Sequence, residues 1–195
     1  MQRLFTMLLA GLALVYLLAC SSRADAGRFP TRYDGLIRTA VHRWWPRHEL
    51  AGWEWFKAQL YQESLLSPDA VSPVGARGLA QFMPATWAEV CSQLGTGLVS
   101  PHVAEHSVNA GAYYMARLWL GWSSPRPEAD RWDLARASYN AGFGNMLKAQ
   151  KKSGGAILYT DIIAALPSVT GHHAKETQTY VERIHHWHKE IRGGR

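Results

Sequence analysis

Residues 53–64 of the chain read WEWFKAQLYQES. Within them Trp53, Phe56 and Leu60 recur at steps of three and four, which is the spacing of an α-helix with one buried face. The next position on that face is a carboxylate, Glu63. Burial disfavours the charged form of a carboxyl group and raises its pKa, so the group can stay protonated and act as an acid. The alternative is that the last helical turn rotates Glu63 into solvent.

Helical spacing also dominates the rest of the chain. Residues 65–85 carry three prolines and two glycines and are expected to be irregular. Residues 71–74 offer at most a brief strand pairing, because Pro73 cannot donate a backbone hydrogen bond. The fold class is therefore predicted to be all-α, as one compact helical domain. The expected helices cover residues 36–44, 53 to a stop at Ser67-Pro68, 86–94, 112–122, 131–140, a segment through Met146 and Leu147, and 180–191.

The composition permits a packed core and hints at an anionic partner. Aliphatic and aromatic residues make up 47% of the 195 residues, which argues against wholesale disorder, and the formal net charge is +6. The sequence has no dense Lys/Arg stripe and no nucleic-acid motif, so nucleic acid is not the expected partner. Only two cysteines occur. Cys91 lies in a predicted helix and is expected to be a small buried core residue.

The N-terminus is typical of an export signal. Residues 1–20 combine a basic start with an almost wholly apolar run, which is short for a membrane span. The run ends in Leu-Leu-Ala-Cys, which resembles a bacterial lipobox with Cys20 as the lipidated residue. Cleavage after Ala26, at an Ala-Asp-Ala site, and an uncleaved anchor are the alternatives. The predicted division is a signal over 1–20, a tether over 21–32 and a domain over 33–195.

Two further segments carry residue types suited to binding a sugar. Residues 75–84 combine two glycines with Gln81, whose amide can donate and accept hydrogen bonds at once. Tyr139 and Asn140 precede a glycine at the end of a predicted helix. Each segment is also compatible with helix capping alone.

Several motifs, taken together and in this order, resemble the soluble lytic transglycosylase (SLT) domain, the goose-lysozyme-like family that acts on bacterial peptidoglycan. Residues 109–115 are similar to a structural helix of that family, and residues 176–181 to its C-terminal segment. The resemblance covers residues 40–190. The motifs that carry it are Gln62-Glu63-Ser64, residues 72–76, residues 78–86 and residues 139–142.

The resemblance implies a lysozyme-like fold and an enzyme that needs no cofactor and no metal. Glu63 would be the single general acid/base and would protonate the β-1,4 glycosidic oxygen between N-acetylmuramic acid and N-acetylglucosamine. The C6 hydroxyl of the muramic acid would then attack its own C1, leaving a 1,6-anhydromuramic end. For Asn140 the alternative role is fixing the turn, and for Tyr180 a place in the core. The substrate-binding residues implied by the motifs are Ser64, Gln81, Tyr139, Asn140 and Tyr180.

The chain departs from the family pattern at two positions. Ala80 stands where the family commonly has Met, and this is expected to remove bulk from the floor of the cleft. Ser138 stands where the family commonly has Ala. Neither change alters the proton chemistry expected of Glu63.

Other functions remain open from the sequence. The same fold could hydrolyse the bond, which usually needs a second carboxylate, or could bind glycan without cleaving it. His102 and His106 match the H-x-x-E-H spacing of a zinc site, and His185, His186 and His188 cluster near the C-terminus, but both groups read as exposed positions. The expected location is outside the cytoplasm: the periplasm, on a lipid anchor in the outer membrane, with peptidoglycan as the partner.

Overall fold

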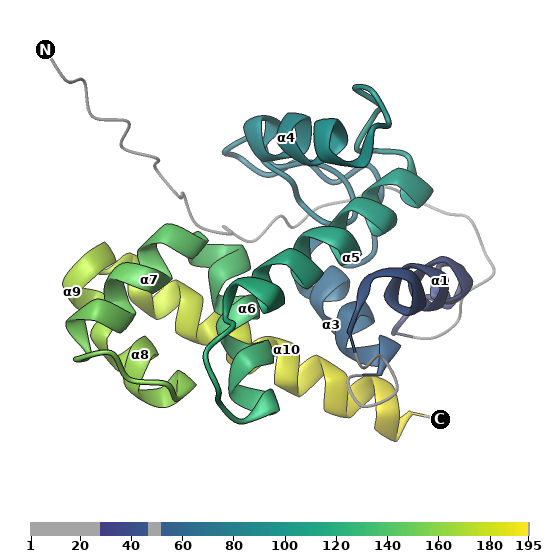
Figure 1. The fold of residues 1–195 in the computed structure, drawn as a ribbon. Helices are drawn as coiled ribbons and strands as arrows, with labels where there is room; N and C mark the ends of the chain where they lie inside the picture. Colours follow the sequence, from purple (N-terminus) through teal and green to yellow (C-terminus); the bar gives the residue numbers. More distant parts are fainter. Residues whose placement is uncertain (1–27, 47–51, 195) are drawn as a thin grey trace, which may run out of the picture.

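The computed structural model describes residues 28–46 and 52–194, and these form an all-α fold, as predicted (Figure 1). Within these ranges β-pairing is limited to isolated bridges that join Arg77 to Val71 and to Phe82. None of the helices there combines the length and apolar character needed to cross a bilayer. The helices are α1 (Asp34–Trp44), α3 (Trp53–Ser64), α4 (Pro84–Leu94), α5 (Ala104–Gly121), α6 (Glu128–Ala141), α7 (Phe143–Lys152), α8 (Tyr159–Ala165), α9 (Pro167–Thr170) and α10 (His173–Gly193).

Helix α10 runs along α3 and α6, and these three helices hold most of the residues that concern function. Helix α5 crosses the middle of the domain, packed against α1 and α6. Helices α7, α8 and α9 group together at the end of the molecule away from α1, and α4 lies beside α5 (Figure 1). The C-terminal helix therefore joins the start of the domain to its later half.

The core is built from apolar residues of nearly every helix. Five of the nine tryptophans are buried and the other four pack partly against the core, so the tryptophans mainly serve packing. Cys91 is buried as expected. The largest fully buried side chains are Trp122, Phe56, Ile37, Leu60, Leu66, Leu79, Met115, Leu134, Met146, Ile162, Leu166 and Ile184.

Helix α3 ends earlier than the sequence indicated. The expected stop was Ser67-Pro68, but the helix closes at Ser64 because Leu65 and Leu66 both adopt left-handed backbone angles, with φ of 53° and 59°. A left-handed non-glycine residue costs roughly 1–2 kcal/mol. Leu66 is only 1% exposed, so burial of its side chain offsets part of this cost.

The described part of the predicted tether lies against the domain. Phe29 contacts the rings of Tyr61 and Trp187, with centroids 4.8 and 6.4 Å away, and Arg28 pairs with Glu190 at 3.4 Å. The chain therefore enters the domain along α3 and α10. The predicted signal, Cys20 and the earlier part of the tether lie outside the described residues.

Candidate active site

Glu63 lies on the last turn of α3 and is 9% exposed. Phe56 and Leu60, on the same face, are fully buried. The helical spacing left burial and exposure of Glu63 both open, and the alternative in which the last turn carries Glu63 into solvent is wrong. The carboxyl also sits at the C-terminal end of the helix, where the helix dipole disfavours negative charge.

The surroundings of Glu63 favour its protonated form. The pKa of the carboxyl is raised from 4.5 to about 8 as the net result of three effects: burial raises it, a hydrogen bond from Tyr180 lowers it, and the nearby Glu176 carboxylate raises it. Burial is the largest of these effects. At neutral pH Glu63 therefore holds a proton that it can donate.

Tyr180, from α10, is the hydrogen-bond partner of Glu63. Its hydroxyl donates to Oε1 of Glu63 at 2.5 Å, and the residue is 3% exposed. Burial and then the charge of Glu63 raise the pKa of Tyr180 well above its usual value, so the phenol stays neutral and remains a donor. Tyr180 is buried, but it contacts Glu63 as well as the core.

Tyr139, from α6, lies close to the Glu63 carboxyl but donates its hydrogen bond to a different group. Its hydroxyl donates to the backbone oxygen of Ala80 at 2.7 Å. Burial raises the pKa of Tyr139 well above its usual value, and the charge of Glu63 adds to this effect. Tyr139 therefore ties α6 to the segment that follows Gly78, on the side of Glu63.

The segment around Gly78 is held tightly in place. A Cβ at Gly78 would lie 2.0 Å from the backbone oxygen of Pro101, and its φ of +76° favours glycine. Gln81 is a left-handed non-glycine residue, with φ of 48°. Its Nε2 donates to the backbone oxygens of Gly78 and Ala70 at 2.9 and 3.1 Å. Strained backbone of this kind is often found at functional sites.

Ser64 connects this segment to α3. It is 8% exposed, and its Oγ lies 2.9 Å from the backbone oxygen of Leu79 and 3.1 Å from that of Leu60. A hydroxyl has one hydrogen to donate, and both neighbours are acceptors. Ser64 can therefore meet a ligand only through the lone pairs of Oγ.

The two departures from the family pattern lie in the core. Ala80 is fully buried, and its Cβ lies 3.0 Å from where a Cβ at Gly111 would stand, so it faces α5. The expectation that Ala80 forms the floor of a cleft is therefore wrong. Ser138 is also fully buried, and its Oγ donates to the backbone oxygen of Leu134 and accepts from Nε1 of Trp122.

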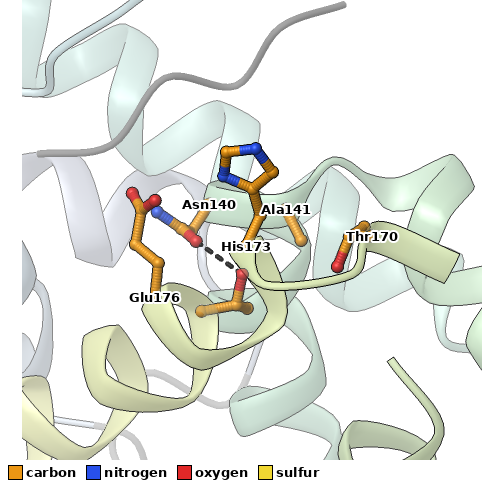
Figure 2. A pocket seen from close by; sticks show the side chains of 6 residues that line it. Asn140, Ala141, Thr170, His173 and Glu176 are labelled. Atoms are coloured by element: carbon orange, nitrogen blue, oxygen red, sulfur yellow. Dashed lines mark hydrogen bonds between the residues drawn. The ribbon is translucent and has the colours of Figure 1, made fainter. Parts of the chain in front are cut away.

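Asn140 lines a small pocket together with Glu176. The pocket measures about 220 Å3, including space open to solvent, and its other walls come from α6, α9 and α10 (Figure 2). Oδ1 of Asn140 accepts a hydrogen bond from Thr177 at 2.7 Å. Helix α6 continues to Ala141, so Asn140 does not end it. Glu176, for which the sequence predicted no role, lines the pocket and raises the pKa of Glu63.

His102 and His106 are not arranged as the zinc motif requires. His102 lies in a turn before α5, with Nδ1 donating to the backbone oxygen of Pro68, while His106 lies on the helix. The two are therefore not one turn apart on a single helix, which the zinc motif requires. In residues 28–46 and 52–194 no group of three or more His, Cys, Asp or Glu side chains is arranged to hold a metal ion.

Comparison with known proteins shows relatives of this chain. Membrane-bound lytic murein transglycosylase F of Yersinia enterocolitica is 32% identical over 156 residues, which is 72% of this chain and 31% of that protein. The protein of the same name from Serratia proteamaculans is 31% identical over 156 residues, with coverage of 72% and 31%. The solved structure of the 70 kDa soluble lytic transglycosylase of Escherichia coli matches with a TM-score of 0.65 and 26% identity, over 83% of this chain and 24% of that one.

The chain spans about a third of the length of the curated relatives that it matches. Residues 51–161, more than half of the chain, match the family described as "Transglycosylase SLT domain". This match includes Glu63, Gln81 and Tyr139. The chain therefore belongs to the transglycosylase SLT domain family.

Proposed function

We propose that this protein is a peptidoglycan lytic transglycosylase with Glu63 as its only general acid/base. The observation that carries the proposal is the buried Glu63 carboxyl, whose pKa is raised to about 8 and which accepts a hydrogen bond from Tyr180. A general acid works best when its pKa lies near the working pH. The family membership and the relatives named as lytic murein transglycosylases support the same substrate.

In the first step Glu63 acts as the acid. Its Oε1 accepts from Tyr180, so Oε2 carries the proton and donates it to the glycosidic oxygen between N-acetylmuramic acid and N-acetylglucosamine. The bond from C1 of the muramic acid to that oxygen breaks, and the N-acetylglucosamine leaves as an alcohol. Positive charge develops at C1, next to a carboxylate that has just become negative.

In the second step Glu63 acts as the base. The C6 hydroxyl of the same muramic acid bonds to C1, and its proton passes to Glu63. The product carries a 1,6-anhydromuramic end, no water is consumed, and Glu63 is protonated for the next cycle. Tyr180 stabilises the intermediate carboxylate, since its hydrogen bond favours the charged form.

The other predicted residues would hold the sugar chain around this carboxyl. We assign substrate contacts to Gln81 through its amide oxygen, to Ser64 through its lone pairs and to Asn140 through its amide nitrogen. The Nε2 of Gln81, the hydroxyl of Ser64 and the Oδ1 of Asn140 are already engaged within the protein. Tyr139 and Tyr180 would fix the position of Glu63 and of the segment after Gly78.

The test is digestion of peptidoglycan sacculi by the full-length chain, with released muropeptides read by mass spectrometry. We expect products one water lighter than reducing muropeptides. Glu63→Gln should reduce their release at least about 100-fold, because general acid–base catalysis contributes about 10²–10⁴-fold. Glu105→Gln, at an exposed position on α5, is the matched control and should retain full activity.

The products also separate the alternative functions. Reducing ends would indicate hydrolysis on the same fold, with Glu176 as the candidate second carboxylate, since it lies close enough to raise the pKa of Glu63. Binding of sacculi without any product would indicate a glycan-binding module. Either result would overturn the transglycosylase proposal.

We also propose that the protein is exported to the periplasm and anchored in the outer membrane through lipidation of Cys20. The apolar run that ends in Leu-Leu-Ala-Cys supports this location. Membrane fractionation of the full-length chain and of Cys20→Ala tests it. We expect the wild-type protein in the outer-membrane fraction and the variant outside it; equal partitioning of the two would contradict lipidation of Cys20.

A further inference from the structure

Gln59 is a buried side chain whose amide has no hydrogen-bond partner. It lies on α3, is 1% exposed, and neither its Nε2 nor its Oε1 is bonded to another of the described residues. Leaving a buried polar group unsatisfied destabilises the folded state. Native proteins rarely keep such a group without a reason, and catalytic roles are one of the known reasons.

Gln59 stands in one row with Glu63. Trp55, Gln59 and Glu63 are spaced by four residues, so they lie above one another on the same face of α3. Helix α10 runs antiparallel along this row, because Tyr180 contacts Glu63 while His188 stacks on Trp55 with ring centroids 3.6 Å apart. Gln59 lies between these two contacts.

The nearest polar group of known role is the Tyr180 hydroxyl. Midway between Tyr180 and His188 on α10 is Ile184, which is fully buried and offers no hydrogen bond. The amide of Gln59, in contrast, lowers the pKa of Tyr180 as a hydrogen-bond donor to the phenol, although the two groups do not reach full hydrogen-bonding geometry in the structure. The hydroxyl of Tyr180 donates its hydrogen to Glu63, and the phenol oxygen can still accept a hydrogen bond. The final torsion of a Gln side chain is broad, so Nε2 can turn toward that oxygen at little cost.

We propose that Gln59 is a positioning residue for the acid/base chemistry of Glu63 and that it acts through Tyr180. This inference rests on the proposed function. Nε2 of Gln59 donates to the phenol oxygen, so the Tyr180 O–H points at Oε1 of Glu63. A hydroxyl that accepts one hydrogen bond becomes a better donor in the next. Gln59 thereby strengthens the bond that stabilises the Glu63 carboxylate between the two steps.

The first experiment replaces Gln59 by Met, which keeps the length of the side chain and removes the amide. We expect kcat on sacculi to fall about tenfold with KM changed less than twofold, and the alkaline limb of the pH profile to move to higher pH. The Tm should change little, because the hydrogen bond to Tyr180 is lost together with a buried amide oxygen that has no partner. Gln150→Met is the matched control: Gln150 lies on α7, its amide donates to the backbone oxygen of Ala156, and activity should be unchanged.

A structural role for Gln59 would give a different pattern. A lower Tm in Gln59→Met, with a matching loss of active protein and an unchanged pH profile, would overturn the proposal. Unchanged kcat would overturn it as well. In a Tyr180→Phe background the proposal expects Gln59→Met to change kcat less than twofold, while a second full tenfold loss would show that Gln59 does not act through Tyr180.

One further readout separates this inference from the proposed function. In protein labelled with ¹³C at the glutamate carboxyl carbon, the Glu63 titration should move to higher pH in Gln59→Met than in the wild type, whether or not sacculi are cleaved. If the wild type releases no anhydromuropeptides but this shift is present, the proposed function fails and the pairing of Gln59 with Tyr180 stands. If anhydromuropeptides are released and the shift is absent, only the role of Gln59 fails.

Discussion

Glu63 and Asp133 are two carboxyl groups at the junction of α3, α6 and α10, and their surroundings act in opposite directions. Burial would raise the pKa of both. For Asp133 burial is outweighed by hydrogen bonds and charges from His185 and Arg136, at 2.8 and 2.7 Å, so its pKa is lowered. Glu63 has a phenol for a partner and another carboxylate nearby, so its pKa is raised to about 8.

The comparison shows that the partners of a buried carboxyl decide its use. Asp133 is ionised and compensates Arg136, which is 3% exposed and lies over the ring of Trp55 at 4.2 Å. The pair lies within α6, and its contacts with His185 and Trp55 join α6 to α10 and α3, but it has no proton to give. Glu63 lacks a cation at hydrogen-bonding distance among the described residues and therefore keeps its proton at neutral pH. The following predictions test this contrast.

Asp133→Ala should have the largest effect on stability. It removes the carboxylate that compensates the buried Arg136, and breaking a buried pair in this way costs about 3–5 kcal/mol. Urea unfolding at pH 7 measures the loss. A loss below about 1 kcal/mol, the range of exposed pairs, would mean that Arg136 finds other compensation and that the two carboxyl groups differ less than we infer.

Glu63→Gln should stabilise the protein. The folded state binds the Glu63 proton more tightly than the unfolded state does. The contribution of this proton to the free energy of unfolding is therefore complete below pH 4.5 and is lost as the pH rises from 4.5 to about 8. The Gln variant has no such loss. Each unit of pKa shift corresponds to about 1.4 kcal/mol, so at pH 7 the variant should be more stable by about 3 kcal/mol.

A series of unfolding measurements between pH 4 and pH 8.5 checks this prediction. The two proteins should have similar unfolding free energies near pH 4 and diverge as the pH rises. A constant difference across the series would show that Glu63 titrates normally. Glu105→Gln, at an exposed position, is the control and should follow the wild type.

Tyr180→Phe should have a smaller effect on the same carboxyl. It removes the hydrogen bond that lowers the pKa of Glu63, so this pKa should rise further. We expect the alkaline limb of the activity profile to move up by about one unit, equivalent to about 1.4 kcal/mol. Activity measured at intervals from pH 5 to pH 10 tests this. A limb that moves down would contradict the assigned direction of the Tyr180 bond.

His185→Ala should have the smallest effect. His185 is bonded to Asp133, but 47% of its side chain is exposed, and exposed ion pairs contribute about 0–1 kcal/mol. Thermal unfolding at pH 7 should therefore change little, and activity on sacculi should not change. A large loss of activity would show that the Asp133 region is coupled to Glu63.

Much of the fold could be predicted from the spacing of apolar residues along the sequence. The spacing of Phe56 and Leu60 put Glu63 on the apolar face, because a helix repeats every 3.6 residues, but it left open whether the last turn rotates Glu63 into solvent. The short helices α8 and α9 were not predicted, since four to seven residues carry too little periodicity. The early end of α3 was missed because nothing local marks Leu65 and Leu66 as left-handed; their conformation follows from tertiary packing of Leu66.

Only part of the candidate active site could be predicted from the sequence. The helical spacing in residues 53–64 singled out Glu63. Tyr180 lies far from it in the sequence and was assigned only by resemblance, because no local pattern joins α3 to α10. Gln59 was missed although a signal existed: it stands four residues before Glu63, on the same row of the helix. Glu176 was quoted only as part of a family segment, and its effect on Glu63 depends on the packing of α10.

The central claim is that Glu63 remains protonated at neutral pH, and a carboxyl titration tests it most directly. The wild-type chain labelled with ¹³C at the glutamate carboxyl carbon is titrated by NMR from pH 3 to pH 10, and the Glu63 signal is assigned by its absence in Glu63→Gln. The account predicts a midpoint near pH 8, matched by the alkaline limb of the activity profile. A midpoint near the ordinary value of 4.5 would contradict it.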